Sequence, residues 1–359
     1  MTPYILLFIN VTFLYFSPNR RVPKLGFYVF LSLLILIAGF RDMIGGYDVY
    51  IYAQVYELGY EFITSYSPFE KGFSWYYIVL NIFNDSREFM FFITALFMFL
   101  LHFYTIKKYS PILYFSAFVF FCKFFLMSFV YLRQGLAMGL VWLSIPLLLN
   151  KKYVKFLVIV VIAFYFHRSA ILFLPLLFIA QRKVNPYQLF LITTGTFIVS
   201  LSPLGPLILN YLIGGFGDDR IMHYTTTYSA ANLFYLMEAG LLSYFALKFQ
   251  KDFYQEKRTT LIFNGFVLYI LIIIISLTNA TFIRLSWVYF IFVVLALPYL
   301  YHFIKDAKLK RTFKILVFVY YSLVFFRLLL VFDGGDFLPY KSIFQDFNRN
   351  GIWEWMEYR

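Results

Sequence analysis

Apolar runs of about 20 residues recur along the whole chain, with little polar sequence between them. A helix of this length rises about 30 Å, which is enough to cross the hydrocarbon core of a bilayer. Charged residues make up 14% of the 359, whereas a soluble domain carries about 25%. The sequence therefore predicts an all-α, polytopic transmembrane helical bundle, formed as one integral membrane domain over residues 1–359.

Weighing apolar length against polar breaks gives twelve candidate spans. They run about 3–17, 24–40, 87–106, 111–129, 130–149, 153–166, 169–181, 187–209, 232–249, 260–277, 284–303 and 313–332. The short spans 153–166 and 169–181 are candidates for a broken pair that meets near His167. The first run lacks the layout of a cleavable signal peptide, so we expect it to be a retained span.

Basic residues are distributed unevenly between alternate loops. One side holds most of the 31 Lys and Arg but few of the 18 acids, and the positive-inside bias places that side in the cytoplasm. Both termini and the long segments 41–86, 210–231 and 333–359 then face outward. Because long loops tend to carry function, we expect the outward face to be the working face. The net charge of +13 then reflects topology, and no nucleic-acid partner is expected.

Arginines gather at the outward loops and outward helix ends. The set comprises Arg41, Arg133, Arg168, Arg220, Arg284 and, deeper within a span, Arg327. A single arginine in such a place is explained by snorkelling to lipid headgroups. Several arginines on the side that the positive-inside bias disfavours are not explained in this way. Because a planar guanidinium holds phosphate oxygens in a bidentate manner, phosphate binding is an alternative explanation. The pattern predicts a cradle for a phosphorylated, and more specifically a pyrophosphorylated, ligand.

Acids and a histidine accompany these arginines. Asp48 and Glu70 lie among glycines and aromatics in the first outward segment, a mixture that suits sugar rings and their hydroxyls. His167, at the junction of two short spans, is either a proton acceptor or a hydrogen-bonded structural residue. No nucleotide, dinucleotide, zinc-protease or nucleophile-elbow motif occurs. For Asp333 and Asp336 a solvated turn is favoured over a metal pair, and for the lone Cys122 a buried structural thiol is favoured.

Together these residues resemble the EpsG-like branch of the Wzy polysaccharide polymerases, which act in bacterial capsule, O-antigen and exopolysaccharide synthesis. The matching blocks are Gly39-Phe40-Arg41 with Asp48 and Tyr50, Glu70-Lys71-Gly72-Phe73, Arg133-Gln134-Gly135-Leu136-Ala137, Lys151-Lys152, Ala163 to His167 with Ser169-Ala170, Arg284, and Pro339-Tyr340. The resemblance covers most of the chain. The Arg133 and His167 blocks are its most specific parts.

The resemblance implies a multi-pass enzyme of the bacterial inner membrane with its active site on the periplasmic side. It implies transfer of a growing glycan from undecaprenyl pyrophosphate to the non-reducing end of a lipid-linked repeat unit, with no cofactor or metal. Membrane lipids, a chain-length regulator and a flippase are the implied partners. Arg133, Arg168 and Arg284, assisted by Arg41 and Arg220, are expected to stabilise the leaving group, with Gln134 and Tyr340 in the substrate site. His167, then Asp48, then Glu70 are the candidate bases.

Three other readings stay open. A GT-C type glycosyltransferase that uses a polyprenyl-phosphate sugar also places acids in its first outward loop, and its architecture is compatible with this hydropathy pattern. An O-antigen ligase shares the donor chemistry. A lipid-linked oligosaccharide flippase belongs to another class, but transporters often show internal repeats and charges at the midplane, and here the charges crowd one face.

Overall fold

The computed structural model describes residues 1–17, 24–205, 207–208, 233–279, 282–331 and 337–345. In these ranges the secondary structure is helical, and the one β contact is an isolated bridge between Arg41 and Ser342. The chain divides into two compact units. Unit 1 comprises Met1–Trp142, Tyr165–His167 and Asp306–Arg359, and unit 2 comprises Leu143–Phe164 and Arg168–Lys305.

Five helical segments of the described chain are long and apolar enough to cross a membrane. They are Arg87–Tyr109, Leu132–Leu149, Lys257–Ile275, Phe282–Phe303 and Ala307–Val331, and six shorter apolar helices accompany them. The predicted class, a membrane-embedded helical bundle, is confirmed, while the count of twelve spans stays a prediction. Helix α16 (Leu233–Phe253), predicted as a span over 232–249, is long enough but is not apolar enough for the first group.

Unit 1 is built on long helices packed through aromatic side chains. Helix α2 (Lys24–Gly39) packs against α6 (Arg87–Tyr109), and α7 (Leu113–Phe124) lies against both α1 (Thr2–Phe16) and α19 (Ala307–Val331). The rings of Phe8, Phe118, Phe121 and Phe325 pack together at these contacts, with centroids of neighbouring rings 4.9–6.3 Å apart. Part of the chain's large phenylalanine content therefore fills the helix interfaces of this unit.

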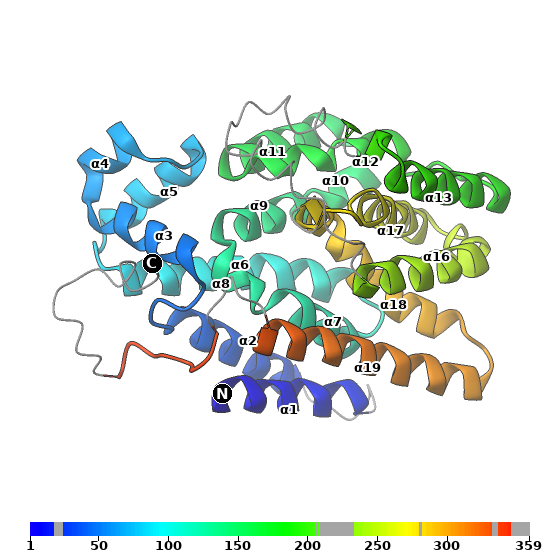
Figure 1. Ribbon diagram of the computed structural model, residues 1–359, viewed down its shortest axis with the longest axis horizontal. Helices are drawn as coiled ribbons and strands as arrows, with labels where there is room; N and C mark the ends of the chain where they lie inside the picture. Colours follow the sequence, from blue (N-terminus) through cyan, green and yellow to red (C-terminus); the bar gives the residue numbers. More distant parts are fainter. Residues whose placement is uncertain (18–23, 206, 209–232, 280–281, 332–336, 346–359) are drawn as a thin grey trace. The chain divides into compact units, whose positions relative to one another are not determined.

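The segment 41–86 is more ordered than the outward loop that the sequence predicts. It forms α3 (Tyr47–Glu57), α4 (Gly59–Tyr66) and α5 (Lys71–Asn81), which Figure 1 shows beside one another. Tyr56, Phe73 and Tyr77 are fully buried, and the rings of Tyr77 and Phe73 lie 4.5 Å apart between centroids. Aromatic residues that the sequence predicts to lie in a loop therefore form a small hydrophobic core.

Two predicted spans are interrupted. The span 111–129 ends as α7 at Phe124 and continues as the single turn α8 (Met127–Val130). Tyr131, with φ −107° and ψ 61°, interrupts the helical conformation before α9 (Leu132–Leu143) begins. Helix α10 (Ile145–Leu149) follows α9. The break at Tyr131 places Arg133 in the first turn of a helix.

Unit 2 packs α17 (Lys257–Ile275) against α13 (Pro186–Leu201), α16 and α18 (Phe290–Phe303). A Cβ at Gly265 of α17 would lie 2.2 Å from a ring carbon of Phe292, so this glycine permits the close approach of α18. Helix α11 (Tyr153–Phe166) ends at the predicted junction. The expected second short span there is the 3-10 turn η1 (Arg168–Phe173) followed by α12 (Pro175–Ile179).

Candidate functional site

Arg133 is the centre of a polar cluster in unit 1. Its Nε donates a hydrogen bond to the Tyr52 hydroxyl at 3.2 Å, and its Nη1 forms an ion pair with Oε2 of Glu70 at 2.5 Å. The guanidinium also lies 5.0 Å from the centroid of the Phe69 ring. Nη2 has no hydrogen-bond partner among the described residues, and the side chain is 24% exposed. The plane of the guanidinium is thus fixed on one edge while the other edge can bind an anion.

The position of Arg133 in its helix adds to this. It is the second residue of α9, and the first backbone N–H groups of a helix point outward with partial positive charge. The helix end and the guanidinium therefore both attract an anion and repel another cation. The neighbouring Gln134 is 4% exposed, so it belongs to the protein interior.

Glu70 directly precedes α5 and is half-buried. Burial raises the pKa of its carboxyl, but the charges of Arg133 and then of His167 outweigh burial, so that the pKa lies below its ordinary value. Glu70 is therefore ionised at neutral pH and is held by Arg133. Both properties make it a poor proton acceptor in the arrangement that the structure describes.

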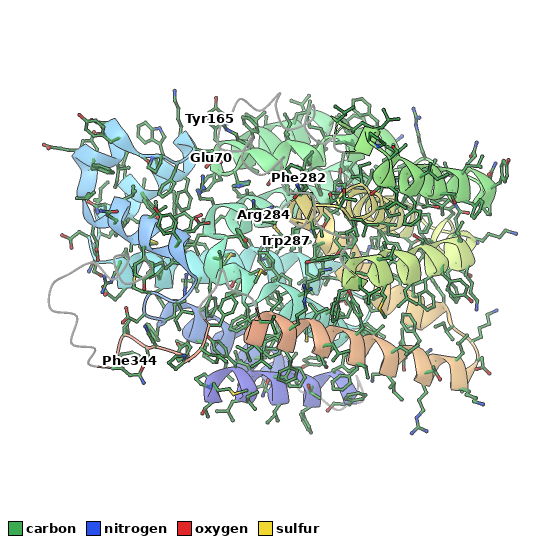
Figure 2. All side chains as sticks on the ribbon, viewed as in Figure 1. Glu70, Tyr165, Phe282, Arg284, Trp287 and Phe344 are labelled. Carbon is green, nitrogen blue, oxygen red and sulfur yellow. The ribbon has the colours of Figure 1, made fainter. Side chains whose placement is uncertain are left out.

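A close backbone contact brings His167 toward Glu70. A Cβ at Gly72 of α5 would lie 2.7 Å from the carbonyl oxygen of Tyr165, so α5 can approach the end of α11 only because residue 72 is glycine. The rings of Tyr76 and Phe166 pack 6.1 Å apart between centroids beside this contact. Glu70 and Tyr165 are labelled in Figure 2. The blocks around Glu70 and His167, far apart in the sequence, are thus joined in unit 1.

Tyr52 and Asp48 complete the cluster from α3. Tyr52 is 3% exposed, and burial raises the pKa of its phenol more than the charge of Arg133 lowers it, so it stays protonated at neutral pH. Asp48 lies one helical turn before it, is half-buried, and contributes to raising that pKa. Four residues predicted as site residues, Arg133, Glu70, His167 and Asp48, are therefore brought together, and Tyr52 joins them.

Arg41 has a different environment. It is 1% exposed, and its Nε and Nη2 donate to the carbonyl oxygens of Ile44 at 3.0 Å and Phe129 at 3.1 Å, while Nη1 donates to that of Ala38. Its guanidinium lies 4.5 Å from the centroid of the Phe91 ring. Burial lowers its pKa to about 10, so it stays charged at neutral pH. Arg41 thus joins the segment after α2 to the segment that leads into α9.

Tyr340 supports the same region from the far end of the chain. Its hydroxyl donates to the carbonyl oxygen of Ile37 at 2.9 Å, and its ring packs edge-on against Tyr4 at 5.5 Å between centroids. The Tyr340 side chain is half-buried. Both contacts are therefore with protein groups, one near the end of α2 and one near the start of α1.

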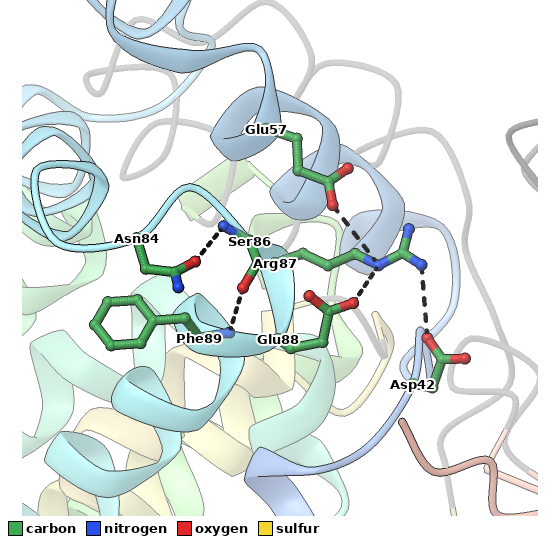
Figure 3. A network of polar contacts seen from close by, with 7 residues as sticks. All are labelled: Asp42, Glu57, Asn84, Ser86, Arg87, Glu88 and Phe89. Carbon is green, nitrogen blue, oxygen red and sulfur yellow. Dashed lines mark hydrogen bonds and ion pairs between the residues drawn. The ribbon is translucent and has the colours of Figure 1, made fainter. Parts of the chain in front are cut away.

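Arg87 is a connecting residue that sequence reasoning did not select. Figure 3 shows its guanidinium facing Asp42, Glu57 and Glu88, with nitrogen–oxygen distances of 3.9, 3.7 and 3.3 Å. It joins the end of α3, the segment after α2 and the first turn of α6. The sequence signal that could have located Arg87 is the N-cap residue Ser86, which precedes it. The Oγ of Ser86 accepts a hydrogen bond from the backbone N–H of Phe89 at 3.3 Å, so Arg87 is the first residue of α6.

Arg168 and Arg284 are found in unit 2. Arg168 begins η1, Arg284 lies in the 3-10 helix η2 (Phe282–Tyr289), and both side chains are half-buried. The two segments pack together, and the Tyr289 hydroxyl donates to the carbonyl oxygen of Leu172 at 2.5 Å. Figure 2 labels Arg284 with Phe282 and Trp287 of the same segment. Arg220, Asp333 and Asp336, named from the sequence, lie outside the described residues.

Glu238 is a second residue that sequence reasoning missed. It lies on α16, is 2% exposed, and its Oε1 accepts a hydrogen bond from the Tyr269 hydroxyl at 2.9 Å. The sequence signal was present, because Glu238 is the only acid within the predicted span 232–249. No group of three or more His, Cys, Asp or Glu within the described ranges is placed to hold a metal ion.

The fold and the cluster define a polytopic helical membrane protein whose polar site is centred on a partly exposed arginine. The model of the EpsG family matches residues 24–342, and the chain therefore belongs to the EpsG family. This is a family of Wzy-type polymerases, so the predicted family is confirmed, and membership suggests a polysaccharide-polymerase-like role. No curated protein and no solved structure gives a significant match to the chain.

Proposed function

We propose that this protein polymerises lipid-linked oligosaccharide repeat units. The growing glycan moves from undecaprenyl pyrophosphate to a hydroxyl at the non-reducing end of an acceptor repeat unit, on the outer face of a bacterial inner membrane. The observation that carries the proposal is the geometry of Arg133, whose Nε and Nη1 are held by Tyr52 and Glu70 while Nη2 has no partner among the described residues. Family membership supports the polymerase-like class.

The proposed chemistry is a single displacement. The acceptor oxygen attacks the anomeric carbon, its proton passes to a base, and the bond to pyrophosphate breaks with its electron pair on the departing phosphate oxygen. Charge therefore grows on the leaving group, and a preorganised guanidinium stabilises it more in the transition state than in the ground state. Because the guanidinium is already fixed in its plane, it needs little reorganisation when that charge develops.

The choice of base follows the electrostatics of the cluster. Glu70 is ionised, paired with Arg133 and lower in pKa than an ordinary carboxyl, which ranks it last. Histidine is the side chain whose unperturbed imidazole exchanges a proton closest to neutral pH, which favours His167, and Asp48 is the alternative. We therefore keep His167 first and Asp48 second as proposed bases, with no cofactor and no metal in the reaction.

The other arginines divide into two proposed roles. Arg168 and Arg284, with Arg220, are proposed to bind the pyrophosphate or the glycan. Arg41 is proposed to hold the backbone around the site in place, because its nitrogens donate to three backbone carbonyls and its side chain is 1% exposed. Gln134 and Tyr340 stay proposals as substrate-binding residues, with membrane lipids, a flippase and a chain-length regulator as proposed partners.

The most useful test in the host is a gel of surface glycans from a strain that lacks this gene. A polymerase loss leaves single repeat units on the surface and removes the ladder of longer chains. Complementation with the wild-type gene restores the ladder, whereas Arg133→Ala inserts in the membrane but leaves single repeats. Absence of all surface glycan in the deletion strain would instead indicate a ligase or a flippase. Use of a polyprenyl-monophosphate sugar as donor would indicate a GT-C type transferase.

A further inference from the structure

The Tyr52 hydroxyl carries a proton that no described residue accepts. Nε of Arg133 donates to its oxygen at 3.2 Å, and no other hydrogen bond joins this hydroxyl to the described part of the chain. A phenol can accept one hydrogen bond and donate another at the same time. Because burial raises the pKa of Tyr52, the phenol keeps its proton at neutral pH. Tyr52 therefore holds Arg133 through a lone pair and has a donor left for a further group.

The planar shape of the Arg133 guanidinium fixes where that group would lie. One N–H bond of Nη2 points the same way as the N–H bond of Nε, so the two nitrogens can bind two oxygens side by side. The Tyr52 oxygen takes the position at Nε, while Nη2 has no hydrogen-bond partner among the described residues. An oxygen bound at Nη2 would therefore lie beside the Tyr52 oxygen, on the order of 2.5–3 Å away, where the phenol can donate to it.

The way in is through the guanidinium and not through the Tyr52 ring. The side chains of Arg133 and Glu70 are 24% and 14% exposed. The Tyr52 ring is covered, with its centroid 5.2 Å from that of Phe69 and 5.9 Å from that of Phe73. The ion pair at Nη1 places the negative charge of Glu70 on the other side of Nη2, and this charge repels an incoming anion. An anion that binds Nη2 is therefore directed toward the Tyr52 hydroxyl.

We propose that Tyr52 is a catalytic residue that donates a hydrogen bond to the departing pyrophosphate, beside Nη2 of Arg133. This inference rests on the proposed function and adds a second donor to the same leaving group. When the bond between the anomeric carbon and the phosphate oxygen breaks, its electron pair stays on the phosphate, and Tyr52 stabilises that charge without giving up its proton. A hydrogen bond to a charged group changes affinity by about 10- to 100-fold.

The test separates a donor to the phosphate from a residue that only positions Arg133. The full-length protein in detergent is titrated with undecaprenyl pyrophosphate, the product that carries the charge. Tyr52→Phe keeps the ring contacts and is expected to lose about 10- to 100-fold in affinity. The same change is then made in Arg133→Lys, which keeps a positive charge but has no Nε for Tyr52 to hold. A further loss of about tenfold or more is expected there. Tyr47→Phe, at an exposed position of the same helix, is the matched control and is expected to change nothing.

Two results would overturn the inference. One is wild-type affinity in Tyr52→Phe. The other is a loss in Tyr52→Phe that disappears when residue 133 is lysine, because the hydroxyl would then act only through the guanidinium. Failure of the proposed function has another signature, in which the wild-type protein forms no glycans of two or more repeats from lipid-linked repeat units, whatever its affinity for undecaprenyl pyrophosphate.

Discussion

Arg133 and Arg41 show how two arginines of similar sequence context come to differ. Both follow an apolar run at an end that the charge bias places outward, and both were expected to stabilise the leaving group, Arg133 directly and Arg41 as an assisting residue. Arg41 is 1% exposed and donates to three backbone carbonyls, so its environment is complete without a ligand. Arg133 is 24% exposed and keeps Nη2 available within the described chain. Sequence context alone could not separate them, because the difference lies in which backbone carbonyls each guanidinium meets.

Arg133→Lys and Arg41→Lys should therefore fail in different ways. A lysine at 133 keeps the charge but loses the planar fork, and we expect polymerisation to fall about 100-fold with normal insertion. A lysine at 41 cannot bridge three carbonyls, and we expect a loss of at least about 3 kcal/mol of stability. Lipid-linked chain length and thermal unfolding in detergent measure the two effects. Equal loss of stability in both variants would contradict the distinction.

The ion pair of Glu70 gives a pH dependence of stability with a definite sign. Its folded-state pKa is lower than the ordinary 4.5, so folding favours the charged form. The stabilisation is complete above pH 4.5 and is lost as pH falls through the lowered folded value. Glu70→Gln should remove this part of the acid dependence of the melting temperature and leave the neutral-pH profile flat. An unchanged acid limb in Glu70→Gln would show that the pair does not contribute to stability.

At the level of elements, the contact between α5 and α11 depends on one glycine. A Cβ at Gly72 would lie 2.7 Å from the Tyr165 carbonyl oxygen, which is backbone and cannot move aside cheaply. We expect Gly72→Ala to shift α5, to separate Glu70 from Arg133 and to lower polymerisation at least about tenfold. Gly195→Ala is the matched control, because a Cβ at that helical position meets nothing within 4 Å. Equal activity of both variants would mean that the contact does not position the site.

The elements themselves were predicted unevenly. Helices such as α6, α17 and α19 follow from long apolar runs, because twenty apolar residues without a turn signal have few alternatives to a helix. The helices of 41–86 did not follow, since their aromatic residues are spaced for packing on one another and not for a lipid-facing span. The meeting of Glu70 with His167 was also hidden, because it depends on a backbone approach at Gly72 that no periodicity reports.

For the molecule as a whole, the EpsG family match establishes the family, while the direction in which the chain crosses the membrane stays a prediction. Substituted cysteines test it. The native Cys122 is 1% exposed and should stay silent toward a membrane-impermeant maleimide. Tyr60→Cys, at an exposed position of 41–86, should react in spheroplasts, whereas Lys308→Cys, exposed at the start of α19, should react only after lysis. The reverse pattern would place the site on the cytoplasmic side.

The central claim is that this protein joins lipid-linked repeat units through a site centred on Arg133. The most direct measurement incubates the purified full-length protein with undecaprenyl-pyrophosphate-linked repeat units and follows the glycans and the lipid by mass spectrometry. The account predicts lipid-linked glycans of two and more repeats, one undecaprenyl pyrophosphate released for each bond formed, and loss of both products in Arg133→Ala. Unextended repeat units with the wild-type protein, or full extension by Arg133→Ala, would contradict it.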